Sequence, residues 1–187
     1  HWFGDLVTCE SWSNLPLNES FANYSQYLWD EHRYGLDEAD YQAEVEMDGY
    51  FQSAQAQGYH NLIWFNYNNR EQMFDGHSYN KGGRILHMLR NYLGDEVFFR
   101  GISLYLNTNQ FKPAEFHQLR LAFEEVSGED LNWFFNQWFL GSGHPILDIK
   151  QHIDTINHTV TVQIDQKQNL DLSPMYRLPI EIAVFDD

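Results

Sequence analysis

Apolar residues recur at intervals of three and four over most of the first 140 positions. In the stretch 17–33, Phe21, Tyr24 and Leu28 share one face of a 3.6-residue period, which predicts an amphipathic helix that ends before Gly35. The same spacing predicts further helices at 37–58, 80–93, 95–106, 113–126 and 131–140. Residues 1–7 are expected to form the tail of a helix, and a polar loop should follow at 8–16.

The pattern changes to alternation of apolar and polar residues after Pro145. This period of two predicts strands at 146–153, 159–164 and 178–185, with short polar turns between them. The chain is therefore expected to be mainly α, with a helical domain at 1–146 and a partial antiparallel sheet at 147–187. The boundary should lie near 144–148.

Residues 59–78 show no periodicity and are rich in Asn, Gly and aromatic residues. Irregular loops of this length are uncommon inside compact domains and are often functional. The segment S-Y-N-K-G-G at 78–83 follows and opens the next predicted helix. It is not a phosphate-binding loop, because the chain contains no G-x-x-x-x-G-K-[ST] pattern.

Composition narrows the classes of partner. The formal net charge of −16 argues against nucleic acid and against an anionic membrane surface, since both are bound through clusters of Lys and Arg. The six Trp, fourteen Phe and eleven Tyr favour a packed globule over disorder. Cys9 is the only cysteine, so neither an internal disulfide nor a Cys-based metal site can form. No apolar run approaches the roughly 18 residues of a membrane span.

Single residues give weak signals when they are taken alone. Glu19 is an acidic residue in the first turn of a helix, which the partial positive charge of the helix N-terminus favours in any protein. The loop residue Glu10 could face a cleft but is expected to meet water. No spacing supports a pair of glycosidase carboxylates. The nine histidines form no H-x₃-H pair, and each is expected to be an ordinary surface or core residue, with His77 and His144 the hardest to dismiss.

The order of residues near the start is more specific than any one of them. W-F-G-D-L-V-T at 2–8, then Trp12, then L-N-E-S-F-A-N-Y at 17–24 resembles the segment after the zinc motif in the aminopeptidase N family of gluzincins. That family has H-E-x-x-H, eighteen residues and then a Glu, and the two His and this Glu hold the metal. The resemblance implies that Glu19 is a zinc ligand, with Ser20 in place of the usual Gly. The count puts the second zinc His one place before His1, so His1 is not a ligand.

A second anchor lies sixty residues after the first. The family has Tyr-Glu-Lys-Gly at the start of a core helix, and this chain has Tyr79 followed by N-K-G. The resemblance implies that Tyr79 donates a hydrogen bond to the transition state, with Asn80 in place of the common Glu. G-S-G-H-P-I-L at 141–147 resembles the end of the family's catalytic domain, and L-P-I-E at 178–181 matches a pattern common in the next domain.

The resemblance implies the helical C-terminal subdomain of a thermolysin-like catalytic domain, followed by the first strands of a β-sandwich. The parent reaction would be zinc-dependent removal of N-terminal residues from peptides, and Asn23 could support the metal shell. The general base and the G-x-M-E-N segment that grips the substrate amine are not in this sequence. The chain alone is expected to bind zinc poorly and to be inactive, because a catalytic zinc needs three protein ligands.

Two further expectations concern partners. Apolar surface that packs against the rest of such a domain would be exposed here, so self-association is expected. The alternative function is a non-catalytic helical interaction module that has kept the family scaffold. The sequence gives no indication of the compartment.

Overall fold

The structure, a computed structural model, describes residues 1–185. The chain forms two compact units, His1–Gly141 and Ser142–Asp187. The assignment of a catalytic-domain part to 1–146 and of a β-sandwich part to 147–187 stays a proposal. No helix in the part of the chain that the structure describes is long and apolar enough to cross a membrane.

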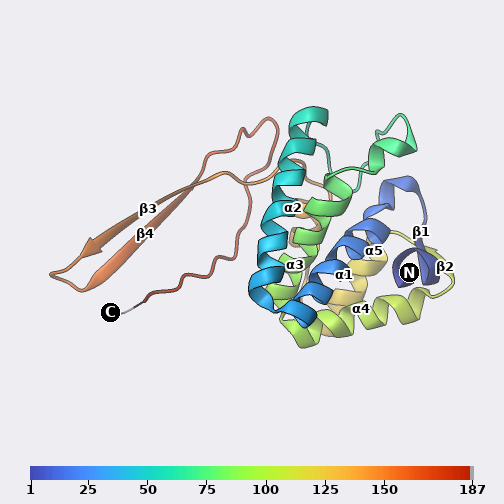
Figure 1. Cartoon of the computed structure of the whole chain (residues 1–187), viewed down its shortest axis with the longest axis horizontal. Helices are drawn as coiled ribbons and strands as arrows, with labels where there is room; N and C mark the ends of the chain where they lie inside the picture. Colours follow the sequence, from blue (N-terminus) through green and yellow to red (C-terminus); the bar gives the residue numbers. More distant parts are fainter. Residues whose placement is uncertain (186–187) are drawn as a thin grey trace. The chain divides into compact units, whose positions relative to one another are not determined.

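The first unit is built from helices, which confirms the mainly α prediction. Their bounds are α1 (Pro16–Tyr34), α2 (Leu36–Gln57), α3 (Gly82–Leu93), α4 (Asp95–Asn109), α5 (Phe116–Ser127) and α6 (Asn132–Trp138). Each lies within a few residues of the range expected from periodicity. Helix α1 packs against both α2 and α3, and Figure 1 shows α1 and α3 side by side.

Apolar periodicity explains the packing of α1. Phe21 and Tyr24 are buried as predicted, whereas Trp29 at the solvent side is 59% exposed. Tyr24 contacts the ring of Phe98 on α4 edge to face, with centroids 5.9 Å apart. The helix ends at Gly35, whose φ of 98° is a conformation that favours glycine, and α2 begins at the next residue.

The helix expected at residues 1–7 is wrong. Residues Trp2–Leu6 form a single irregular turn in which Gly4 has φ 126°, and β1 (Val7–Cys9) follows. Strand β1 pairs in parallel with β2 (Lys112–Ala114), which places Pro113 in a strand, and α5 begins only at Phe116. A pairing between two three-residue segments a hundred positions apart leaves no local periodicity from which to predict it.

The long loop after α2 is irregular as expected but firmly anchored. It contains a 3₁₀ turn, η3 (Arg70–Met73), and ends in a π-helical turn, η4 (His77–Lys81), that runs directly into α3. Leu62 and Ile63 are buried, and the Ile63 amide donates to the Phe139 carbonyl at 2.8 Å. Helix α3 therefore begins two residues later than predicted, because the residues before it form the π turn.

The second unit contains an antiparallel hairpin of β3 (Leu147–Asp154) and β4 (Thr159–Gln166). Its turn is closed by Asp154, which accepts the amides of Ile156 and Asn157 at 2.9 and 3.0 Å. The third strand expected at 178–185 is wrong, since none of these residues is in a strand. Alternation indicates which side chains could share a face, but a strand also needs a neighbouring backbone to pair with.

Candidate active site

The structure brings Glu19 and Tyr79 together from two different elements. Glu19 lies in the first turn of α1 and Tyr79 in the middle of the turn η4. Burial of the phenol raises the pKa of Tyr79 to about 12, and hydrogen bonding toward the nearby Glu19 carboxylate and its negative charge add to the effect. The phenol therefore stays a neutral donor over the whole physiological range.

A hydrogen bond next to this pair joins the two elements. The Ser20 hydroxyl donates to the carbonyl of Ser78 at 2.7 Å in a buried position. The approach is possible because the next helix starts with two glycines. A Cβ on Gly82 would lie 1.8 Å from Ser20 Oγ, and one on Gly83 would lie 2.1 Å from Asn23 Oδ1. The Gly-Gly pair thus lets the start of α3 contact α1 beside Glu19.

Other residues near Glu19 support the helix rather than the carboxylate. Asn23 donates from Nδ2 to Glu46 Oε1 on α2 at 2.9 Å, so this bond links two helices. Cys9 Sγ lies 3.6 Å from Asn18 Nδ2, and burial raises the pKa of this thiol, with Glu19 adding to the effect. Cys9 is therefore a neutral thiol. Glu10 is exposed, as expected.

The structure also contains a buried polar cluster that sequence reasoning missed. Asp75 Oδ2 lies 2.8 Å from His60 Nε2 and 2.7 Å from His77 Nδ1, and all three side chains are buried. The expectation that His60 and His77 are ordinary residues rested on the lack of H-x₃-H spacing. His60 and His77 lie seventeen positions apart in a loop, so they cannot show that spacing. The only available signal was the short D-G-H sequence directly before the second anchor.

Among the described residues this cluster is also the one group of three metal-binding side chains, but its geometry fits hydrogen bonds better than a metal. Ligand atoms on one zinc ion lie roughly 3.3 Å or more apart, given metal–ligand distances near 2 Å. Both nitrogens here approach the carboxylate oxygen more closely than that. The buried Nζ of Lys81, which has no hydrogen-bond partner, adds positive charge near Asp75. The cluster does not include Glu19.

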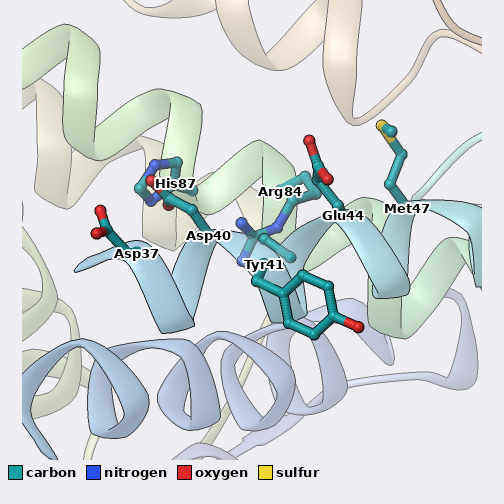
Figure 2. A pocket seen from close by; sticks show the side chains of 8 residues that line it. Asp37, Asp40, Tyr41, Glu44, Met47, Arg84 and His87 are labelled. Atoms are coloured by element: carbon teal, nitrogen blue, oxygen red, sulfur yellow. The ribbon is translucent and has the colours of Figure 1, made fainter. Parts of the chain in front are cut away.

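A separate hollow of about 610 Å³ lies between α2 and α3. Figure 2 shows acidic side chains of α2, among them Asp37, Asp40 and Glu44, around Arg84 and His87 of α3. The guanidinium of Arg84 lies 4.6 Å from the centre of the Tyr27 ring. Neither Glu19 nor Tyr79 lines this hollow. It is therefore distinct from the pair of residues that the sequence singled out.

The Glu19 carboxylate is of the right type for zinc, which binds carboxylate oxygen as well as His nitrogen. Within the described residues, however, Glu19 belongs to no group of three metal-binding side chains. The described part of the chain thus offers no three-ligand site that includes Glu19.

Comparison with known proteins decides the family. The Peptidase family M1 domain matches residues 1–138. The chain belongs to peptidase family M1. This confirms the resemblance to the zinc aminopeptidases of the aminopeptidase N family and, with it, the gluzincin fold expected for the helical part.

Curated relatives of this M1 chain are much longer than it is. It is 35% identical over 158 residues to the Tricorn protease-interacting factor F2 of Thermoplasma acidophilum, which covers 79% of this chain and 19% of that protein. It is 29% identical over 198 residues to a probable aminopeptidase 1 of Sulfurisphaera tokodaii, which covers 98% of this chain and 23% of that protein. The chain spans about a fifth of the length of these relatives.

Solved structures agree with this assignment. The M1 chain matches the aminopeptidase A of Legionella pneumophila with a TM-score of 0.75. The match covers 89% of this chain and 18% of that protein. At 22% identity it shows a shared fold alone. The chain matches an M1 zinc metallopeptidase of Deinococcus radiodurans with a TM-score of 0.62, at 26% identity, over 78% of its length and 31% of that protein's.

Proposed function

We propose that this chain carries one zinc ligand, Glu19, and the transition-state donor, Tyr79, of a zinc aminopeptidase that removes N-terminal residues from peptides. The proposal is supported by the buried Ser20–Ser78 hydrogen bond, which joins the two segments, and by the Glu19 carboxylate being near enough to raise the pKa of Tyr79. The two side chains come from segments sixty residues apart, and the roles implied by the family resemblance require them to meet. A fold that merely kept the family's helices would not need this carboxylate and this phenol to be adjacent.

The proposed chemistry requires this chain mainly to hold Glu19 and Tyr79 in position. A bound zinc would polarise the scissile carbonyl and activate a water molecule for attack on it. Tyr79 would donate its proton in a hydrogen bond to the oxygen that becomes negative in the transition state. A pKa of about 12 keeps that proton on the phenol at neutral pH, so the donor is present in every molecule. Because the Tyr79 hydroxyl lies near Glu19, it would lie beside a metal ion bound by the Glu19 carboxylate.

The decisive experiment is Tyr79→Phe in the full-length zinc enzyme. Loss of one oxyanion donor should lower kcat by roughly 10²–10³ with a much smaller change in KM. Tyr92→Phe is the matched control, because the Tyr92 hydroxyl also donates to a carboxylate, that of Glu129, at 2.8 Å but in an exposed position. An unchanged kcat in the Tyr79 variant would remove this residue from the mechanism.

We further propose that residues 1–187 alone bind zinc weakly and hydrolyse no peptide. Support comes from the lack, among the described residues, of a three-ligand group that includes Glu19, and from the chain's coverage of about a fifth of its relatives. Isothermal titration with zinc and an assay on an aminoacyl p-nitroanilide test this directly. Tight one-to-one binding of zinc or turnover of the substrate by the isolated chain would contradict it.

The alternative is a non-catalytic interaction module, and one observation favours contacts with partners. Large apolar side chains are exposed in the first unit, among them Trp2 at 69% and Phe111 at 83%. Such surface promotes association, so we propose that the isolated chain self-associates. A sedimentation coefficient independent of concentration would contradict this. The gene sequence upstream separates the two functions, because H-E-x-x-H must end one residue before His1 if the enzyme proposal holds.

A further inference from the structure

The turn that presents Tyr79 has an uncommon hydrogen-bond pattern. Within η4 the amide of Lys81 donates to the carbonyl of Gly76 at 2.9 Å, and the amide of Gly82 donates to that of His77, each five residues back. A π-helical turn of this kind is rare and is often found at functional sites. Its first amides have no partner inside the turn, so another group has to accept them.

Asp75 is that acceptor. Its Oδ1 accepts the amide of His77 at 2.9 Å and the amide of Ser78 at 3.1 Å. Its backbone carbonyl accepts the amide of Tyr79 at 3.2 Å. One residue thus accepts the amides of three successive residues of the turn, and Tyr79 is the last of them.

The other carboxylate oxygen fixes the orientation of Asp75. Oδ2 accepts from His60 Nε2 and His77 Nδ1, so the carboxylate has four donors and the side chain is only 1% exposed. Burial alone would raise the pKa of Asp75, but the hydrogen bonds from His60 and His77 outweigh it and hold that pKa below its usual range. Asp75 is therefore a carboxylate anion that cannot rotate without losing buried hydrogen bonds.

His60 holds Asp75 from the side opposite the turn's amides. Its Nδ1 lies 2.7 Å from the carbonyl oxygen of Asn61, which can only accept, and its Nε2 faces the ionised Asp75. The two contacts hold the imidazole ring in one orientation beside the carboxylate. Its ring stacks between Trp64 and His77, with centroids 4.3 and 3.8 Å apart. A buried, hydrogen-bonded His60–Asp75 pair thus supports the turn.

We propose that Asp75, paired with His60, is a positioning residue for Tyr79: it fixes the π turn so that the phenol meets Glu19. The proposal rests on the proposed function of Tyr79. Asp75 has no role in the chemistry itself and acts only through the backbone of residues 77–79. Loss of its charge should release the turn, and the Tyr79 hydroxyl should then leave Glu19 in part of the population.

The first experiment follows the phenol without any assay of activity. In the chain labelled with ¹³Cζ-tyrosine, the signal lost in Tyr79→Phe identifies Tyr79, and Glu19→Gln shows how it moves when the charged acceptor is removed. Asp75→Asn should move the Tyr79 signal in the same direction. The control is Asp130→Asn, since Asp130 also accepts a backbone amide, that of Asn132 at 2.8 Å, but is exposed.

His60→Gln keeps the experiment decisive if Asp75→Asn does not fold. This variant leaves the Asp75 carboxylate on the turn and removes only the imidazole that hydrogen-bonds it, so a smaller shift in the same direction is expected. A Tyr79 signal that stays at its wild-type position in every folded variant of Asp75 and His60 would overturn the proposal.

The second experiment uses the full-length zinc enzyme. Asp75→Asn should lower kcat tenfold or more with little change in KM, and it should have no further effect in a Tyr79→Phe background, because it acts only through Tyr79. An equal loss in both backgrounds would overturn the positioning role in favour of a general structural one. If Tyr79→Phe alone leaves kcat unchanged, the proposed function fails, while the shift of the Tyr79 signal still decides whether Asp75 positions the phenol.

Discussion

The Ser20 hydroxyl donates a buried hydrogen bond of 2.7 Å to the carbonyl of Ser78, fifty-eight residues away. Each of these serines is next to a residue of the proposed site: Ser20 directly follows Glu19 on α1, and Ser78 directly precedes Tyr79 in η4. The bond therefore sets the distance between the two segments at the point where their functional side chains meet.

The first prediction concerns the close approach of Ser20 to Gly82, which leaves no room for a side chain at position 82. Gly82→Ala should destabilise the fold by about 2–4 kcal/mol, because the new Cβ would lie 1.8 Å from Ser20 Oγ and 2.6 Å from Ser20 Cβ. Ser20→Gly removes both atoms, so the same alanine should cost much less in that background. Urea unfolding of the two single variants and the double variant measures the coupling.

Gly49→Ala is the matched control for this cycle. Gly49 lies inside α2, and a Cβ there would lie 3.3 Å from the end of the flexible Asn80 side chain. Because alanine favours a helix over glycine by about 1 kcal/mol, this change should be neutral or stabilising. Additive effects of Gly82→Ala and Ser20→Gly would show that the two positions do not clash.

The second prediction follows from the environment of the Tyr79 phenol. Its pKa is about 12 because of burial first and the Glu19 hydrogen bond and charge second. Glu19→Gln removes the negative charge, so the pKa should fall toward the ordinary value of 10 but stay above it. Titration of the ¹³Cζ signal of Tyr79 measures both values. A pKa that does not respond to Glu19→Gln would mean that the two groups do not interact in solution.

The helices could be predicted from the sequence because each has a repeating local signal. The stripe of Phe21 and Tyr24 indicates the buried face of α1, and Gly35 marks its end. The β1–β2 pairing was not predicted, and the strand predicted at 178–185 is absent, for one shared reason. Strand formation depends on which backbone lies alongside, and the sequence of the strand itself does not contain that information.

The candidate site likewise contains residues that could be predicted from the sequence and residues that could not. Glu19 and Tyr79 could be found because a known family pattern names them, although no physical property of either residue alone does so. The cluster of His60, Asp75 and His77 could not be found, because these residues are brought together only by the folding of an irregular loop. Burial brings these ordinary residue types into one hydrogen-bonded cluster, and burial of a loop is not visible in its composition.

The third prediction tests how three helices are joined near the same core. Arg90 on α3 donates to Glu31 on α1 at 2.6 Å and to Asp95 on α4 at 2.8 Å. Arg90→Lys keeps the charge but loses the planar fork, so it should cost about 1–3 kcal/mol of unfolding free energy in urea. Arg100→Lys is the control, because its pair with Glu96 is exposed and 3.6 Å long, and its cost should lie within about 0.5 kcal/mol. Equal costs would contradict the bridging role.

The last prediction concerns Lys81, whose ammonium is buried without a hydrogen-bond partner. Burial lowers the pKa of Lys81 from 10.5 to about 8, and the charge of Asp75 offsets this only in part. The folded state therefore binds fewer protons than the unfolded state between pH 8 and pH 10.5, so this residue makes stability rise with pH in that window.

Lys81→Met removes the buried charge and keeps most of the side-chain volume. The variant should be more stable than the parent chain by roughly 3 kcal/mol below pH 8, and the difference should shrink toward zero by about pH 10.5. Lys112→Met, at an exposed lysine, should show no such trend. Since other titrating groups are common to both proteins, the difference in urea midpoints at each pH isolates Lys81. A difference that stays constant from pH 7 to pH 10.5 would show that packing, and not the buried charge, sets it.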